Sequence, residues 1–275
     1  MSRRTLASVP VNVALAAATV FAAAPLAWMV SASFMHAGDA TVVPPRFLPS
    51  DPTIEHYVSL FTRLDMARHF LNSAFVTTLA TVLSVTINSM AGYAFAKLPF
   101  GARDRTFRGL TLALVVPAQV GMLPLFLLLR ELGLVNTFAG VLVPYLASVF
   151  GIFLIRQYAL SVPDDLLDAA RLDGAGEARV FAMIVVPLIR PILTTLAMFT
   201  FLNAWNDFLW PLVTILTKQE AFTLQLGLAT FQGAHQTQWH YVAAANIMSM
   251  LPLLVLFLLA QRFFVRGIAT QGLKG

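Results

Sequence analysis

Long apolar segments constrain the fold of this chain more than any other feature. An α-helix needs about 20 apolar residues to cross the hydrocarbon core of a bilayer. Its backbone also satisfies its own hydrogen bonds, as lipid requires. Segments long enough to cross recur between polar intervals, at residues 11–31, 70–96, 107–129, 137–158, 187–216 and 241–264. The sequence therefore predicts an all-α, polytopic membrane protein with six transmembrane helices.

Composition excludes several other classes of protein. Charged residues make up 11% of the chain, whereas soluble domains carry about 25%. The formal charge of +5 suggests nucleic acid, but the cations lie in short loops without a block of like charge. Membrane lipid is therefore the expected partner, and nucleic acid is not. Cysteine is absent and the five histidines are scattered, so we expect no metal site.

The distribution of the basic residues predicts the orientation. Arg3 and Arg4 precede the first apolar segment, which is longer than the core of a signal peptide, so we expect an uncleaved span. With both termini in the cytoplasm, most of the 18 lysines and arginines fall in cytoplasmic segments, as the positive-inside rule requires. We expect a multi-pass protein of the bacterial plasma (inner) membrane, with residues 161–187 in the cytoplasm and the polar loop 217–240 outside.

The polar interval at 161–187 is patterned as two short helices. Ser161 is a candidate N-cap, and Asp164 follows it at capping-box spacing. Gly174 predicts the end of this helix, because glycine accepts the left-handed conformation found there. A second amphipathic helix is expected from 177 to 184. Since the interval holds no catalytic groups, we interpret it as a docking surface for a soluble partner; the alternative is a solvated connector.

Other polar features lie close to the spans or within them. Pro117 and Pro124 are expected to break the third span, with Gln119 between them. Residues 53–61 resemble an amphipathic helix at the membrane interface. Asp207 is the one acidic residue expected at membrane depth or near the far interface.

Motifs for catalysis are missing. The sequence has no P-loop, no Gly-x-Ser-x-Gly and no His-Glu-x-x-His, so we expect no catalytic residues and no ATPase activity in this chain. Intramembrane carboxylates are scarce, which disfavours a stand-alone, proton-coupled secondary transporter. An intramembrane enzyme would need clustered His, Asp or Ser residues at a common depth, and the sequence shows no such cluster.

The spacing of Asp168-Ala169-Ala170, Gly174, Ile184 and Pro187 resembles the EAA signature of the membrane subunits of bacterial ABC importers. Aspartate stands where glutamate is usual, and Val186 stands where leucine is usual. The segments Ala91-Gly-Tyr-Ala-Phe-Ala-Lys97, Trp205-Asn-Asp-Phe-Leu-Trp-Pro211 and Arg262-Phe-Phe-Val-Arg-Gly267 agree as well. Together they resemble the second permease of carbohydrate importers of the maltose and multiple-sugar type.

This resemblance implies the transmembrane domain of a type I importer. The chain would pair with a sister permease, dock an ABC ATPase dimer and receive solute from an extracytoplasmic binding protein. It would bind no cofactor itself, since ATP and Mg²⁺ belong to the ATPase. The expected divisions are residues 1–69, 70–265 and 266–275. The residues of the coupling helix and its flank that would dock the ATPase are Asp168, Ala169, Ala170, Arg171, Asp173, Gly174, Ile184 and Pro187.

A substrate path needs hydrogen-bonding groups and aromatic faces in a cavity. Residues of these types on the third and fifth spans are Asn203, Trp205, Asn206, Asp207 and Gln119. The alternative is that they tie helices together. The cargo is also open: a permease for another solute, such as a glycerophosphodiester or a polyamine, would carry the same signature, because the signature concerns the ATPase contact.

Overall fold

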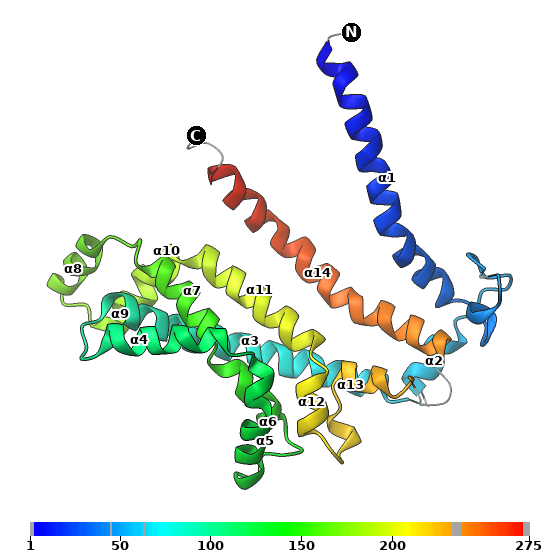
Figure 1. Cartoon of the computed structure of the whole chain (residues 1–275). Helices are drawn as coiled ribbons and strands as arrows, with labels where there is room; N and C mark the ends of the chain where they lie inside the picture. The colour runs from blue at the N-terminus through cyan, green and yellow to red at the C-terminus, as the bar shows by residue number, and fades with distance from the viewer. Residues whose placement is uncertain (1–2, 45, 63, 233–237, 272–275) are drawn as a thin grey trace. The chain divides into compact units, whose positions relative to one another are not determined.

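The computed structural model describes residues 3–44, 46–62, 64–232 and 238–271, and within them it is helical, without a β-strand (Figure 1). The long helices are α1 (Arg3–Ala32), α3 (Met66–Lys97), α11 (Arg190–Asn206) and α14 (Trp239–Gln271). The shorter ones are α2 (Glu55–Thr62), α4 (Arg103–Leu112), α5 (Met122–Glu131), α6 (Phe138–Leu146), α7 (Val149–Ala159), α8 (Asp164–Leu172), α9 (Glu177–Val180), α10 (Val186–Leu188), α12 (Leu209–Thr214) and α13 (Leu224–Ala229).

The described helices supply four spans, or up to six if each of two bent pairs is one span, and the sequence predicts six. Four are long and apolar enough to cross a membrane: Pro10–Ala32, Met66–Lys97, Phe138–Ala159 and Trp239–Leu259. Two bent helix pairs would each supply one further span: Arg103–Val115 with Ala118–Glu131, bent by 100°, and Glu177–Leu188 with Arg190–Asn206, bent by 83°. The all-α, polytopic fold class is thereby confirmed.

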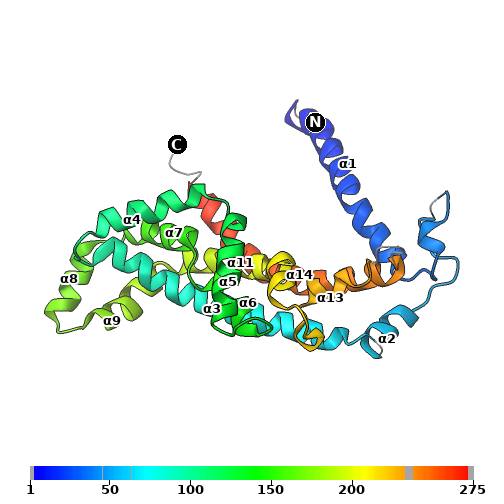
Figure 2. The same cartoon turned by 60° about the horizontal axis from the view of Figure 1, so that its bottom comes forward.

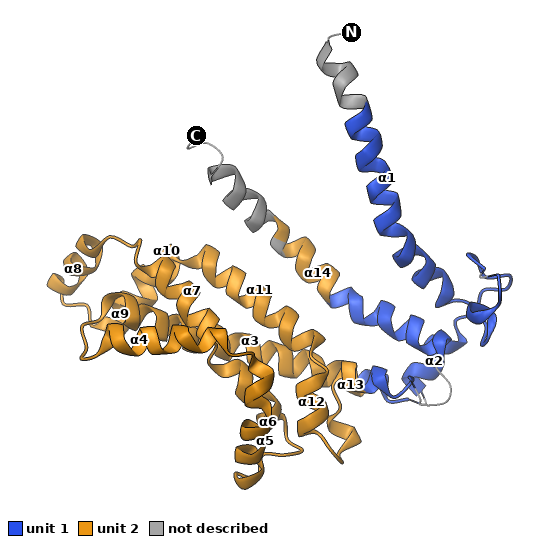
Figure 3. Ribbon diagram, viewed as in Figure 1, with its two compact units in different colours: residues 1–67, 227–252 blue, residues 68–226, 253–275 orange. Residues whose placement is uncertain are grey.

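The chain forms two compact units (Figure 3). The first holds residues 1–67 and 227–252. In it Ala32 and Met35, at the end of α1, pack against Ala243 of α14, and His56 Nε2 lies 2.7 Å from the carbonyl oxygen of Met35. The predicted amphipathic helix at 53–61 is present as α2, with His56 and Leu60 buried. Residues 233–237 of the predicted outer loop lie outside the described residues.

The second unit, residues 68–226 and 253–275, is built along α3. In both views α8 and α9 lie at one end of this unit, beyond α4 and α7 (Figures 1 and 2). Helix α3 packs tightly on α7, because Gly92 has no side chain: a Cβ there would lie 2.7 Å from Cβ of Ile155. Buried Asn88 joins the same two helices, since its Oδ1 accepts from the backbone N–H of Ser148 at 2.9 Å.

The breaks in the spans differ in detail from the sequence predictions. The third span bends at Val116–Pro117, as expected. The predicted break at Pro124 is wrong, because Pro124 is the third residue of α5, where the missing N–H has no intrahelical partner to lose. The fourth span is divided by Ala147–Ser148 into α6 and α7. The fifth begins its main helix at Arg190, after the bend, and not at Pro187.

Candidate functional site

Helix α8 begins differently from the capping box that the sequence predicts. It starts at Asp164 after Pro163, and no side chain caps it. The Ser161 hydroxyl instead donates to the carbonyl oxygen of Tyr158 at 2.7 Å, so the prediction of Ser161 as N-cap is wrong. Asp164 and Asp165 do occupy the first turn, where their charges favour the positive end of the helix dipole.

The end of α8 lies where the glycine predicts it. Gly174 has φ of +84°, and nothing lies within 4 Å of where its Cβ would be, so backbone conformation alone selects glycine here. The N–H of Ala175 donates to the carbonyl oxygen of Ala170 at 2.9 Å and closes the helix. The predicted second helix is also present: α9 continues through a π-helical turn, Phe181–Val185, into α10.

The two faces of α8 have different chemistry. Leu167 is fully buried on a cluster that includes Val162, Ile155 and Val180. The opposite face carries exposed leucines between acidic and small side chains, and the residues of this outer face are Asp165, Leu166, Asp168, Ala169, Leu172 and Asp173. Leu172 is 89% exposed. A helix that is packed on one face, and that presents exposed leucines among aspartates on the other, has the form of a docking surface.

The predicted docking residues around this face have different environments. Ala170 and Ile184 pack against the Leu167 cluster, whereas Pro187 is exposed. Arg171 binds carboxylates of its own chain: Nη1 lies 2.8 Å from Asp168 Oδ1, and Nε lies 2.7 Å from Glu177 Oε1. These ion pairs hold the pKa of the Arg171 guanidinium above its usual range. The structure thus gives Arg171 partners within the chain.

Helix α3 supplies two further contacts to this segment. Nζ of Lys97 donates to the Val162 carbonyl and to Asp164 Oδ1, both at 2.7 Å, and lowers the pKa of the Asp164 carboxyl by hydrogen bond and charge. The Tyr93 hydroxyl donates to Glu177 Oε2 at 2.7 Å. These residues were noted in the sequence only as part of a resembling segment. Their contacts depend on tertiary structure, which spacing along the chain does not reveal.

A cavity of about 520 Å³ lies inside the second unit, where α5, α6, α11 and α12 meet α3. Three predicted substrate-path residues, Gln119, Asn203 and Asp207, line it together. Trp205 does not, because it is 1% exposed and stacks on Phe201. Asn206 is exposed, and its side-chain amide donates to its own helix, at the carbonyl oxygen of Leu202.

Further polar residues complete the cavity wall. The residues that sequence reasoning missed are Ser84, Tyr145, Ser148 and Thr200. The Tyr145 hydroxyl donates to Asp207 Oδ2, while Asp207 Oδ1 accepts from the N–H of Trp210 at 3.2 Å. Ser148 and Asp207 lie at helix breaks, and these breaks are on the wall of the same cavity. The only signal in the sequence was a polar residue within an apolar span, and this signal does not reveal which way the side chain points.

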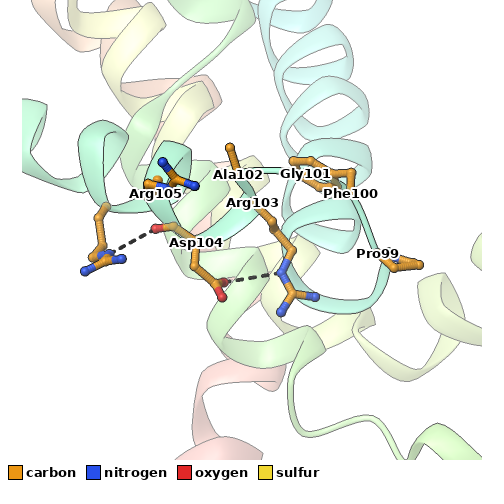
Figure 4. Close-up of a pocket in the computed structure, with 8 residues that line it drawn as sticks. Pro99, Phe100, Gly101, Ala102, Arg103, Asp104 and Arg105 are labelled. Carbon is orange, nitrogen blue, oxygen red and sulfur yellow. Dashed lines mark hydrogen bonds and ion pairs between the residues drawn. The ribbon is translucent and has the colours of Figure 1, made fainter.

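A second hollow, of about 670 Å³, lies at the connection of α3 and α4 (Figure 4). Its lining includes three arginines, Arg103, Arg105 and Arg108, and a single acid, Asp104. Oδ1 of Asp104 accepts a hydrogen bond from Nε of Arg103 at 3.3 Å. Its arginines and exposed setting differ from the cavity around Asp207. We therefore place the candidate substrate path in the latter.

Up to six spans, a cavity in the second unit that carries several hydrogen-bonding side chains, and a cationic end with an amphipathic helix define a transport subunit of the membrane. Comparison with known proteins specifies it further. The model of the family described as "Binding-protein-dependent transport system inner membrane component" matches residues 88–270. The chain belongs to this family, and it is a multi-pass permease subunit of an ABC importer of the inner membrane.

Several relatives resemble it over most of their length. The arabinooligosaccharides transport system permease protein AraQ of Halalkalibacterium halodurans is 38% identical, over 83% of this chain and 82% of the relative. The sn-glycerol-3-phosphate transport system permease protein UgpE of Yersinia pestis is 37% identical, over 72% and 71%. A crystal structure of a bacterial ABC transporter that imports the acidic polysaccharide alginate matches with a TM-score of 0.83 and 26% identity, over 96% of this chain and 99% of that one.

Proposed function

We propose that this chain forms half of the translocation path of an ABC importer for a neutral sugar or oligosaccharide. The observation that carries the proposal is the cavity around Asp207, which combines hydroxyl, amide and carboxylate groups with the ring of Trp210. Sugars present many hydroxyl groups and apolar ring faces, and such a lining satisfies both. The relative named for arabinooligosaccharides supports the same substrate class.

The charges of the cavity favour a neutral sugar over the alternatives. Among its lining residues is no lysine or arginine, which the phosphate of a glycerophosphodiester would need. Its one carboxylate, Asp207, already accepts from Tyr145 and Trp210, whereas a polyamine would need several free acids. The relative named for sn-glycerol-3-phosphate keeps the phosphate ester as the second candidate.

The outer face of α8 is proposed to dock a separate ATPase, which would bind ATP and Mg²⁺. Small Ala169 allows close approach, and exposed Leu172 offers an anchor. A sister permease would complete the path. A solute-binding protein would deliver the sugar from outside the cell membrane, on the side where the sequence predicts the loop 217–240. The cations near α8, among them Lys97, Arg103, Arg105, Arg108 and Arg156, support a cytoplasmic location for this end and for both termini.

In this proposal the mechanism is alternating access. Closure of the ATPase pair on ATP would move the docked α8, and the spans would rock between inward-facing and outward-facing states around the cavity. The residues of this chain would bind and orient the sugar, while hydrolysis would occur entirely on the partner. The predicted divisions at 1–69, 70–265 and 266–275 stay a prediction.

Docking is tested by co-purification of the ATPase from cells that express the importer. Leu172→Glu places a charge on the outer face of α8 and should abolish capture of the ATPase. The matched control is Leu132→Glu, an exposed leucine after the end of α5. Equal capture by both variants would refute docking through α8.

Transport is tested in proteoliposomes that contain the complete importer, with radiolabelled arabinotriose as the first neutral probe. Uptake should require internal ATP and persist with an uncoupler. Uptake that stops with the uncoupler and ignores ATP would identify a secondary transporter instead. Competition by glycerol 3-phosphate, without competition by other neutral oligosaccharides, would favour the phosphate ester.

A further inference from the structure

Two residues of α3 face the α8–α9 segment side by side. Tyr93 and Lys97 are four residues apart and therefore share one face of the helix. Both are withdrawn from solvent: Tyr93 is 3% exposed, and the side chain of Lys97 is 6% exposed. Nothing in the proposed transport path or docking surface yet explains why a tyrosine and a lysine are buried here.

The two residues hold opposite ends of α8. Lys97 binds the N-terminal end of α8, because its Nζ donates to the Val162 carbonyl and to Asp164, the first residue of the helix. Tyr93 binds near the C-terminal end of α8, because its hydroxyl donates to Glu177. Glu177 also accepts from Arg171, which lies in the last turn of α8. Buried Leu167 packs between these attachments.

The cost of burying a charge explains why Lys97 stays bonded to α8. The Lys97 ammonium is withdrawn from solvent, and a buried charge is costly unless it is paired and hydrogen-bonded. The lysine therefore stays in place only while the α8 entry supplies the Val162 carbonyl and Asp164. Asp164 is itself 73% exposed, so solvent weakens the ion pair, and the Val162 carbonyl supplies the second bond that the lysine needs. The Tyr93 ring also packs independently of its hydroxyl's hydrogen bond, since its centroid lies 5.3 Å from the ring centroid of Phe181.

Helix α3 continues from these attachments to the cavity. It is a single helix without a break, and Ser84 on it lines the cavity. From Ser84 to Lys97 the helix rises about 20 Å at about 1.5 Å per residue. Asn88 and Gly92 between them bind α3 tightly to α7. Without Tyr93 and Lys97, α8 is joined to the spans by the turn at 160–163, by the Leu167 cluster and by the bend near Ile189.

We propose that Tyr93 and Lys97 are positioning residues that fasten α8 to α3, so that a displacement of α8 is delivered to the cavity wall as motion of the paired α3 and α7. The inference rests on the proposed function, in which an ATPase moves α8. It assigns a role to Tyr93 and Lys97 in the segment Ala91–Lys97, a role that is separate from the proposed docking face and from the cavity around Asp207.

A distance measurement tests the attachment without any ligand. The chain has no native cysteine, so Ala169→Cys on α8 and Met90→Cys on α3, both exposed, carry the only spin labels. In nanodiscs the parent should give one narrow distance distribution by pulsed electron resonance. The double variant Tyr93→Phe/Lys97→Met should broaden it, with a detached fraction that rises by about tenfold, as expected for lost hydrogen bonds to charged groups.

The control is Tyr158→Phe/Lys218→Met, which removes the same atoms at exposed positions. Retention of the narrow distribution by Tyr93→Phe/Lys97→Met would overturn the proposal. If that variant is unstable, Tyr93→Phe and Glu177→Gln are measured singly, since Tyr93→Phe keeps the ring packing and Glu177 is an exposed position.

A coupling measurement separates positioning from simple support of the fold. In the assembled importer, Tyr93→Phe/Lys97→Met should retain the ATPase and its basal hydrolysis, while arabinotriose taken up per ATP hydrolysed falls by about tenfold. An unchanged ratio would refute transmission through α3 even if the distances broaden. If the parent importer captures no ATPase, the docking proposal fails, while the distance result still judges the attachment.

Discussion

The Tyr145 hydroxyl donates a hydrogen bond to Asp207, and this bond joins α6 to the break between α11 and α12. The other oxygen of Asp207 accepts from the N–H of Trp210, in the first turn of α12. One carboxylate thus closes a helix and presents a polar group to the cavity. Its two oxygens have separable functions, which substitutions can distinguish.

Asp207→Asn should preserve the fold and impair transport. Asparagine retains an acceptor for the Trp210 N–H but removes the charge from the cavity wall. Asp207→Ala should also lose the hydrogen bond to the N–H of Trp210, at a cost of about 1 kcal/mol. Thermal unfolding in detergent should therefore separate the two variants, whereas arabinotriose uptake should fall in both. Equal melting temperatures would show that the Trp210 contact contributes nothing.

Asn88→Ala should destabilise the second unit. Asn88 is fully buried; its oxygen accepts from the Ser148 N–H, and its amide donates to the Ser84 carbonyl at 2.7 Å. Removal takes this partner from the partly buried N–H of Ser148, which costs up to about 1–3 kcal/mol. The matched control is Asn206→Ala, because Asn206 is exposed and bonds only within its own helix. A comparable loss of stability in both variants would contradict the role assigned to Asn88.

Hydropathy and helix-ending signals were sufficient for the fold. The apolar segments that form the four to six spans and the end of α8 at Gly174 follow from local chemistry: the length of an apolar run in one case, and glycine's tolerance of positive φ in the other. The Ser161 cap failed because the hydroxyl bonds backward to Tyr158, a local competition that composition does not decide. The break assigned to Pro124 failed because a proline in the first turn costs no hydrogen bond.

The candidate sites were only partly predictable. The spacing of residues along the chain reveals neither which way a side chain points nor which distant residue it contacts. Asn203 and Asp207 lie on the cavity wall, while Trp205 beside them is buried against Phe201. Tyr145 reaches the same cavity from 62 residues away in sequence. Likewise, the partners of Lys97 lie more than sixty residues further along the chain. Such pairs meet only after the spans have packed.

Gly92→Ala should separate α3 from α7. The new Cβ would lie 2.7 Å from both Cβ and Cγ2 of Ile155, closer than real carbon contacts, so the helices must move apart. Overpacking of this kind costs about 1–3 kcal/mol. The control is Gly109→Ala in α4, where nothing lies within 4 Å and the better helix propensity should be neutral or stabilising. Thermal unfolding compares them, and equal stability of both variants would refute the tight contact.

The attachment of α8 should resist a fall in pH until acidic conditions. Lys97 lowers the pKa of Asp164 below its ordinary value of 3.8. A lowered carboxyl pKa stabilises the folded state fully above the ordinary value, and this contribution is lost as the pH falls through the lower, folded pKa. The distribution of the Ala169–Met90 spin-label distance should therefore stay narrow over about pH 5–8 and broaden only below the ordinary pKa range of aspartate.

In Asp164→Asn the distribution should already be broader at neutral pH, whereas Asp165→Asn, at an exposed neighbour in the same turn, should match the parent. Glu177 is the other carboxylate of the attachment, so any acid response that remains in Asp164→Asn belongs to its bonds with Arg171 and Tyr93. Broadening of the parent distribution already between pH 7 and about pH 5 would contradict the Lys97–Asp164 pair as the basis of this resistance.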